Sequence, residues 1–393
     1  MIRPSQKAAQ FQESVIREMT RLYLLHAAPD GVNLAQGFPD FPAPTELKEA
    51  ACAAIRADIN QYAITWGAKS LREAIAEKTL RHYGVRPDPE REITVACGAT
   101  EAMMAALLAL VDPGDEVIVF EPLYENYGPD SVLSGATPRI VTLHAPDWRL
   151  DFDELAAAFN EKTRAIIINT PHNPTGKVFT RAELTEIARL CQKWDVVAIT
   201  DEIYEHLVYE GEHIRLADID GMMERTVTIT GLSKTYSATG WRIGWLIAPP
   251  EATIAIRRVH DFLTVGAAAP LQEGAATALA FPDSYYADLC TSYKQKRDVF
   301  LETLRQVGLE ASTPAGAYYI LTDASAWLTA LSLADGRALA EWLVQEKGIA
   351  IVPGSSFFAN PADGKNLIRF CYCKKPETLA KAAMLLDRAA PTR

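Results

Sequence analysis

Short runs of β-branched and other apolar residues alternate with amphipathic stretches between about residues 92 and 248. Seven of these runs predict strands, at 92–97, 115–121, 137–143, 164–170, 196–201, 225–230 and 243–248. The segments 99–111 and 181–195 have the polar and apolar spacing of helices. Near-continuous apolar strands separated by helices indicate an α/β fold with a mostly parallel, seven-stranded sheet that is covered on both faces.

The pattern changes after about residue 283. A long helical stretch (284–307) leads into short strands at 317–323 and 366–373 and further helices at 335–347 and 376–390. This mixture predicts a second, smaller α+β domain. The first 44 residues hold no strand of the main sheet, so we expect them to pack against that domain. The sequence therefore predicts a large domain over 45–283 and a small domain formed by 1–44 and 284–393.

Charge and composition narrow the function classes. The 393 residues carry 50 acidic and 39 basic side chains, a formal charge of −11 that argues against nucleic acid or an anionic membrane as a partner. No stretch approaches the roughly 18–20 apolar residues of a membrane span, and the N-terminus is too polar for a secretory signal. Of six scattered cysteines, only Cys371 and Cys373 are close, and they read as small core residues rather than a metal pair. We expect a cytoplasmic protein without a bound metal.

The strongest local signal is GLSKTYSATGWRIGW at 231–245, directly after the predicted strand 225–230. Lys234 follows the small hydroxyl residue Ser233 at the end of a buried strand, which is an unusual place for a solvated charge. Arg242 lies between Gly240 and Gly244. This arrangement suggests that Lys234 and Arg242 converge on an anion. The alternative is an ordinary surface loop. The functional interpretation is a Schiff-base lysine beside a phosphate clamp.

Asp201 ends the predicted strand 196–201, and Tyr204 follows three residues later. A carboxylate at this end of a strand projects into the crevice where open α/β sheets bind ligands. Asp201 could keep a pyridine nitrogen protonated, and Tyr204 could reach a phenolic oxygen on the same ring. The alternative for Asp201 is a helix N-cap.

The loop TPHNPTGKVFT at 170–180 places Asn173 just after another strand, where its amide could donate to a phenolate oxygen. Asn-Pro and Thr-Gly are also ordinary turn formers. Of the bonds Glu121–Pro122, Thr170–Pro171 and Asn173–Pro174, we expect at least one to be cis.

The segment ACGATEAMMAAL at 96–107 runs from a strand into a helix. Gly98, Ala99 and Thr100 would present free backbone N–H groups and a hydroxyl at the helix N-terminus, which suits a phosphate. Tyr124 lies just past the next strand and could stack on a flat cofactor, although a core tyrosine fits the pattern as well.

All of these signals fall at the carboxyl ends of predicted strands or in the loops that follow. The motifs CGAT at 97–100, HNPTG at 172–176, DEIY at 201–204 and SKTYSATGWRIGW at 233–245, together with Tyr124, resemble the class I/II aminotransferases of fold type I over essentially the whole chain. The resemblance implies a pyridoxal-phosphate-dependent aminotransferase, with Lys234, Asp201 and Tyr204 as catalytic residues. It also implies an amino acid and a 2-oxo acid as substrates.

The resemblance adds residues that local patterns do not single out. Gly37, in NLAQGFPDF, matches the substrate loop, and Arg369, in NLIRF, matches the arginine that binds the substrate α-carboxylate; Asn173 would share this task. Ser233 and Arg242 match phosphate ligands. Tyr62 matches a tyrosine that reaches the phosphate in the partner subunit, which implies a homodimer with shared active sites.

Substrate choice rests on weaker signals. Thr100 and Glu101 stand where an aspartate-specific branch has a lysine, and the loops at 33–41 and 170–179 look more like the branch acting on kynurenine, glutamine, methionine and aromatic amino acids. We therefore expect a bulky neutral substrate. A cysteine-S-conjugate β-lyase using the same lysine is one alternative. A non-catalytic, cofactor-binding regulator is another, but such proteins usually carry a DNA-binding segment, for which this chain has no spare length or basic patch.

Overall fold

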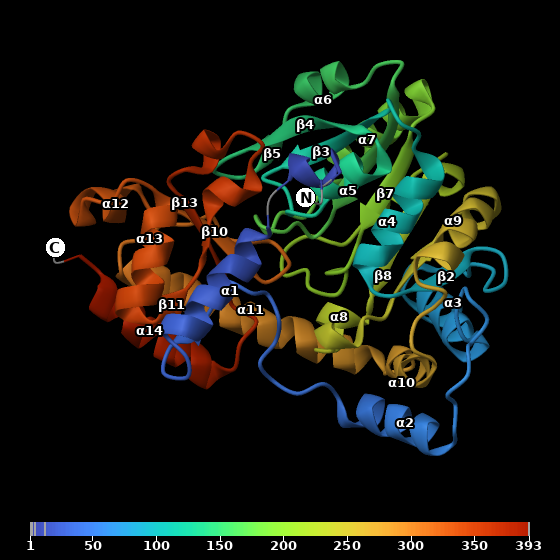
Figure 1. Cartoon of the computed structure of the whole chain (residues 1–393), viewed down its shortest axis with the longest axis horizontal. Helices are drawn as coiled ribbons and strands as arrows, with labels where there is room; N and C mark the ends of the chain where they lie inside the picture. The colour runs from blue at the N-terminus through green and yellow to red at the C-terminus, as the bar shows by residue number, and fades with distance from the viewer. Residues whose placement is uncertain (1–2, 4, 12, 392–393) are drawn as a thin grey trace.

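The computed structural model describes residues 3, 5–11 and 13–391 and is built around an eight-stranded sheet (Figure 1). In spatial order its strands are β2 (Ile93–Ala96), β9 (Gly244–Ile247), β8 (Thr226–Gly231), β7 (Val197–Asp201), β6 (Thr163–Asn169), β3 (Glu116–Glu121), β4 (Thr137–His144) and β5 (Arg149–Leu150). The five strands from β8 to β4 run parallel, whereas β9 is antiparallel to both of its neighbours. All seven predicted strands are present. The eighth, β5, pairs with β4 over two residues, too few to leave a pattern in the sequence.

Both faces of the sheet are buried, which explains the near-continuous apolar strands. On β6, Ala165 and Ile167 belong to a core shared with α4 (Ala99–Leu110) and α9 (Pro250–Leu263). Ile166 and Ile168 face the other core, which includes α7 (Arg181–Trp194). Further helices of this part are α2 (Thr45–Arg56), α3 (Lys69–Tyr83), α5 (Tyr127–Ser134), α6 (Phe152–Ala158), the one-turn α8 (Leu232–Thr235) and α10 (Ala269–Leu279).

A second group of elements lies beside the sheet, at the left of Figure 1. It contains the antiparallel sheet β10-β13-β12 (Tyr319–Asp323, Leu367–Cys371, Val352–Pro353) and the helices α11 (Asp283–Gln306), α12 (Ser325–Leu331), α13 (Gly336–Trp342) and α14 (Pro376–Ala389). A π-helical turn, Leu343–Lys347, continues α13 within the predicted helix 335–347.

The N-terminal segment packs against this second group. Helix α1 (Val15–His26) packs against the elements at 343–353, and β1 (Val32–Asn33) pairs in parallel with β11 (Ile349–Ala350). Figure 1 shows the blue N-terminal helix lying against the red C-terminal elements. The domain boundaries proposed from the sequence are compatible with this arrangement and remain a prediction.

Short 3₁₀ helices complete the structure, at Ala8–Gln10, Leu216–Asp218, Met223–Arg225, Thr239–Trp241, Gly354–Phe357 and Pro361–Gly364. The three X-Pro bonds named above, at Pro122, Pro171 and Pro174, are all cis. Within the described ranges no helix combines the length and apolar character needed to cross a membrane.

Candidate active site

A cavity of about 350 Å³ lies at the carboxyl ends of β6, β7 and β8, between the main sheet and the second group of elements. It brings together most of the residues singled out in the sequence: Gly37, Ala99, Thr100, Tyr124, Asn173, Asp201, Tyr204, Ser233, Lys234, Arg242 and Arg369. The strand-end rule therefore led to one site, because parallel strands deliver their carboxyl ends to a common edge.

Lys234 lies in the single turn α8, three residues beyond the end of β8. Its half-buried Nζ donates a hydrogen bond of 3.2 Å to the backbone oxygen of Gly37 and lies 5.9 Å from the centre of the Tyr318 ring. Burial lowers the pKa of this amine to about 8. At pH 7 roughly a tenth of the amine is then uncharged, far more than for an ordinary lysine, and the uncharged amine is the nucleophilic form.

Asp201 ends β7 and is held by three neighbouring groups. The hydroxyl of Tyr127 donates to its Oδ2 at 2.8 Å, and the backbone N–H of Ile203 donates to its Oδ1 at 3.3 Å. The amide of Asn169 donates to its backbone oxygen at 2.8 Å. Burial raises the pKa of Asp201, while the hydrogen bonds from Tyr127 and from the backbone N–H of Ile203, and the charge of Lys234, oppose that rise. The carboxylate is thus fixed in orientation and poorly solvated, which favours pairing with a cation in the cavity.

Arg369 in β13 forms the opposite wall and is 1% exposed. One Nη donates to the side-chain oxygen of Asn173 at 3.0 Å and the other to the backbone oxygen of Ala35 at 2.6 Å. The Nε has no hydrogen-bond partner, and no acidic side chain of the described residues pairs with this guanidinium. A buried arginine without a counter-ion is costly, so the cavity is suited to receive an anion such as a carboxylate.

Two aromatic residues complete the walls near Asp201. The hydroxyl of Tyr204 lies 3.0 Å from that of Tyr319, and burial raises the Tyr204 pKa well above its usual value, so the group stays a protonated donor. The ring of Tyr124 meets Tyr127 edge to face, with centres 5.5 Å apart, and borders the cavity. A flat ligand could lie against it.

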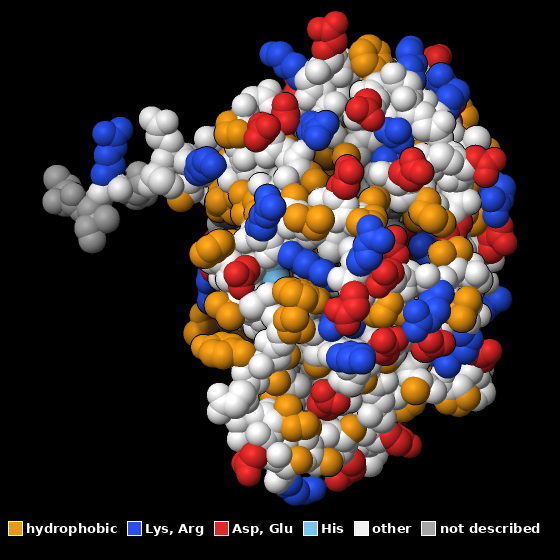
Figure 2. Space-filling model, turned by 90° about the vertical axis from the view of Figure 1, so that its right-hand side faces the viewer, with side chains coloured by type: hydrophobic (Ala, Val, Ile, Leu, Met, Phe, Trp, Pro, Cys, Tyr) orange, Lys and Arg blue, Asp and Glu red, His pale blue; other side chains and the backbone are white. Residues whose placement is uncertain are grey.

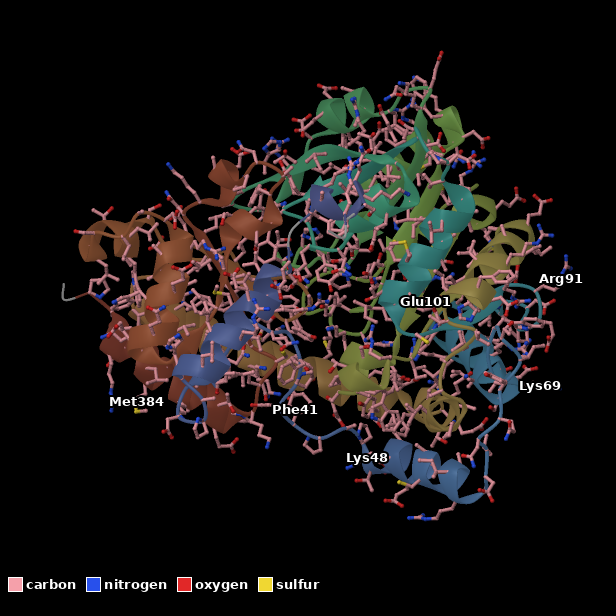
Figure 3. The ribbon with its side chains drawn as sticks, viewed as in Figure 1. Phe41, Lys48, Lys69, Arg91, Glu101 and Met384 are labelled. Atoms are coloured by element: carbon pink, nitrogen blue, oxygen red, sulfur yellow. The ribbon has the colours of Figure 1, made fainter. Side chains whose placement is uncertain are left out.

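An anion cradle forms where β2 passes into α4. Gly98 has a φ of 83°, and an added side-chain carbon there would collide with the guanidinium of Arg242. Arg242 lies 3.5 Å from the hydroxyl of Thr100 at the N-terminus of α4. Free N–H groups at Ala99 and Thr100, the helix dipole and the arginine together suit a phosphate. Glu101, labelled in Figure 3, is turned to other partners and accepts from the backbone N–H of Cys97 at 2.8 Å.

These groups fit pyridoxal phosphate, the cofactor that the resemblance implies. The cavity offers an amine of lowered pKa, a buried carboxylate without a cation partner among charged side chains, an aromatic wall and a separate phosphate cradle. Gly98 borders the cavity only through its contact with Arg242. No group of three or more potential metal ligands gathers in the described residues.

Tyr62, like Gly98, is a predicted site residue that does not line this cavity. Its side chain is 87% exposed, in the segment that precedes α3. The exposed position agrees with the expectation that Tyr62 acts outside its own site, but it does not by itself place the side chain in a partner's site.

The sequence did not single out Tyr127, Asn169 and Tyr319, which all line the cavity. Asn169 is the last residue of β6 and its Oδ1 accepts from the backbone N–H of Asn173 at 2.7 Å. The strand-end rule that selected Asp201 would also have selected Asn169. Tyr127 and Tyr319 carry no such signal, because their roles depend on contacts across the fold.

Comparison with known proteins gives the same answer over the whole chain. The family model for aminotransferases of class I and II matches residues 29–386. The methionine aminotransferase of Escherichia coli is 39% identical over 381 residues, which cover 97% of each chain. Kynurenine–oxoglutarate transaminase 1 of Homo sapiens is 38% identical, over 89% of this chain and 90% of the relative. The solved structure of N-succinyldiaminopimelate aminotransferase from Mycobacterium tuberculosis superimposes with a TM-score of 0.93 at 38% identity, covering 99% of this chain and 100% of that chain.

Proposed function

Because the chain belongs to the class I and II aminotransferases, enzymes that use pyridoxal phosphate, we propose that it moves the α-amino group of a bulky neutral amino acid to a 2-oxo acid in two successive half-reactions. The observation that carries this proposal is that Lys234 and Arg369 line the same cavity. The amine serves the reaction at Cα, and the guanidinium serves the carboxylate that every α-amino acid and 2-oxo acid carries.

When bound, pyridoxal phosphate supplies an aldehyde that condenses with amines and a ring that accepts the electron pair left at Cα. Lys234 is the lysine that lines the cavity in the described part of the chain, and we assign to its Nζ both the attachment and the proton transfer at Cα. Its pKa of about 8 allows the amine to take up a proton and to give it back near neutral pH. Asp201, oriented by Tyr127, would hold the positive charge of the ring nitrogen.

The remaining residues would hold and orient the cofactor and the substrate. Asn173 gives its side-chain oxygen to Arg369, so its NH₂ group is left to donate into the cavity toward a ring oxygen, together with Tyr204. The cradle at Ala99 and Thr100, with Ser233 and Arg242, would bind the phosphate. Gly37 has no side chain, since one would collide with Tyr319, and its backbone runs close to Lys234.

The support for a bulky neutral substrate is the apolar part of the cavity lining. Ile16, Phe38 and Tyr124 line the cavity, and the relatives named above include enzymes for methionine and kynurenine. A competing class is substrates with a distal carboxylate, because Arg17 at the cavity's edge could pair with that group. A relative 39% identical is described as a probable N-succinyldiaminopimelate aminotransferase.

A panel of amino donors with a common 2-oxo acid acceptor tests the proposal. We expect the highest kcat/KM for methionine, glutamine, kynurenine or an aromatic amino acid, with aspartate at least about 10-fold lower. Fastest turnover of N-succinyldiaminopimelate, together with its loss in Arg17→Ala, would replace the neutral class by the acidic one. Release of pyruvate and ammonia from a cysteine conjugate would show β-lyase activity.

We also propose that the active unit is a homodimer in which Tyr62 reaches the phosphate cradle of the other subunit. Tyr62, Ile64, Phe262, Leu263 and Val265 form an apolar surface, with Tyr62 87% and Phe262 92% exposed. Figure 2 shows the side of the molecule that bears α3 and α9, where hydrophobic side chains gather toward the left-hand edge. So much exposed aromatic surface is unusual for a monomer and suits a self-complementary, two-fold interface.

The apolar surface is tied directly to the phosphate cradle. His260 in α9 lies 2.8 Å from the backbone oxygen of Thr65 and, through its other ring nitrogen, 2.8 Å from Glu101 in the first turn of α4. The Tyr62 segment, the end of α9 and the start of α4 are therefore held at one corner of the molecule. A partner that covers this corner would lie next to the mouth of the cavity. The cytoplasmic setting inferred from the sequence also remains a prediction.

A further inference from the structure

Asp130 is a buried carboxyl group that the proposed mechanism does not use. Its side chain lies in α5, is 6% exposed and lines the cavity. The Oδ2 atom is buried and has no hydrogen-bond partner. Because a buried polar atom without a partner is costly, such groups in a binding cavity usually serve a ligand or a neighbouring charge.

The helix places Asp130 beside the residues that hold Asp201. Asp130 follows Tyr127 by three positions in α5, so both side chains lie on the same face of the helix. Tyr127 donates its hydroxyl to Asp201 at 2.8 Å. Burial first, and the charge of Asp201 second, raise the pKa of Asp130 to about 7. The negative charges of the two carboxyl groups, which line the same cavity, therefore repel each other.

No cation neutralises Asp130 from the elements packed around it. Helix α4 offers Glu101, which is paired with His260. Glu116 on β3 is paired with Arg139 on β4, Glu121 accepts from Thr142 and from the backbone N–H of Ala359, and His144 is paired with Glu154. Tyr124 and Tyr127 are neutral, because burial raises both pKa values. At the edge of the cavity, Glu125 accepts from Ser14, and Arg17 is exposed.

We propose that Asp130 is a second carboxyl group that sets the charge of the cavity beside Asp201 and acts, through Asp201, on the ring nitrogen of the bound cofactor. This inference rests on the proposed role of Asp201. Asp130 touches neither substrate nor reacting atoms in it; the residue is an electrostatic partner. When its carboxyl loses a proton, the added negative charge favours the positively charged form of the lysine-linked cofactor. When it is protonated, that support is withdrawn.

The pH titration of the cofactor's absorbance in the holoenzyme tests this inference without relying on turnover. Asp130→Asn removes the charge and nearly preserves the shape. We expect its titration midpoint to fall by about 0.5–1 pH unit relative to the wild type, less than the roughly 1–3 units that a charge in direct contact produces. Asp130→Glu keeps a carboxyl group and should stay close to the wild-type midpoint. Asp288→Asn, which removes an exposed carboxylate on α11, controls for net charge.

Each outcome decides the matter. A midpoint in Asp130→Asn that moves no more than in Asp288→Asn overturns the proposal. Asp130→Val is the second charge-removing variant; if both neutral variants fail to fold while Asp130→Glu folds, the carboxyl serves the fold and the proposal also falls. Asp201→Asn separates the two levels of inference. A shift in Asp201→Asn without one in Asp130→Asn refutes only the role of Asp130, whereas an unchanged midpoint in Asp201→Asn refutes the role of Asp201 on which it rests.

Discussion

The guanidinium of Arg369 donates a hydrogen bond of 3.0 Å to the side-chain oxygen of Asn173. Arg369 comes from β13 of the second group of elements, and Asn173 from the loop after β6 of the main sheet. The residue proposed to bind the substrate carboxylate is thus joined to one proposed to bind the cofactor ring. Movement of β13 or of the loop after β6 would therefore shift both the substrate-binding and the cofactor-binding side of the cavity.

Arg369→Lys should separate substrate binding from cofactor binding. An ammonium group cannot give two parallel hydrogen bonds to a carboxylate, so we expect kcat/KM to fall by about 100-fold, mostly through KM. Cofactor affinity, followed by absorbance on titration of the apoenzyme, should change by less than about 3-fold, since Arg369 lies outside the phosphate cradle. Equal losses in both measurements would contradict the assignment.

The rate at which Lys234 captures the cofactor should depend on pH with an apparent pKa below that of an ordinary lysine. Because burial lowers the pKa of its amine to about 8, the rate of capture by the apoenzyme should rise with pH and level off above about 8 rather than above 10. Borohydride trapping and peptide mapping should place the adduct on Lys234. Lys234→Ala should retain cofactor binding and lose transamination by about 10³-fold or more. An adduct on another lysine would remove the central claim.

Asp201→Asn should lower kcat strongly, and Tyr127→Phe should lower it by a smaller factor. The asparagine cannot hold a positive charge, so we expect kcat to fall by at least about 100-fold with little loss of thermal stability. Tyr127→Phe removes one hydrogen bond that orients the carboxylate and should cost about 10-fold. Near-native turnover in Asp201→Asn would make Asp201 only a structural residue that caps the chain after β7.

The buried ion pair between Lys78 of α3 and Glu205 should contribute more to the free energy of unfolding than an exposed ion pair does. Their atoms lie 2.8 Å apart, both side chains are buried, and Glu205 also accepts from Tyr83 and from Thr230 at 3.0 Å. Lys78→Met leaves an uncompensated buried charge and should lower the free energy of unfolding by about 3–5 kcal/mol. Arg86→Met, which removes an exposed pair, should cost less than about 1 kcal/mol.

The same pair predicts the sign of a pH dependence. Burial alone would raise the pKa of Glu205, but Lys78 and the other partners hold it well below its usual value. Its contribution is therefore complete above the pKa of a free glutamate, about 4.3, and is lost as the pH falls below that value. Denaturant melts from pH 7 to pH 3 should show a steeper loss of stability in the wild type than in Lys78→Met. Parallel curves would contradict this.

Mixing two inactive variants tests the shared site. Lys234→Ala supplies an intact Tyr62, and a disruptive Tyr62 variant supplies an intact Lys234. If Tyr62 acts in the partner's cavity, each mixed dimer holds one complete site, and activity should recover toward one site in two. No recovery after confirmed subunit exchange, or full activity in a sedimenting monomer, would exclude Tyr62 from the site.

The strand-end residues were predictable because their chemistry and their position appear in the same local pattern. Lys234 and Asp201 each follow an apolar run, and such runs end at a common edge of the sheet. Arg369 and Gly37 needed the family resemblance, since nothing near them shows that they meet Asn173 and Lys234 from another part of the fold. Asp130 has no sequence signal at all. Only the burial of its carboxyl group and the absence of a partner for Oδ2 make it noticeable.

The cavity draws its reactive groups and its selective walls from different parts of the chain. Lys234 and Asp201 stand on the central sheet, whereas Ile16, Arg17 and Phe38 come from the N-terminal segment that packs with the C-terminal elements. Substitutions at these three positions can therefore change the walls of the cavity while Lys234 and Asp201 stay in place. This division lets the choice of amino acid change while the residues on the central sheet stay the same, and the relatives of this chain bear the names of methionine, kynurenine and N-succinyldiaminopimelate enzymes.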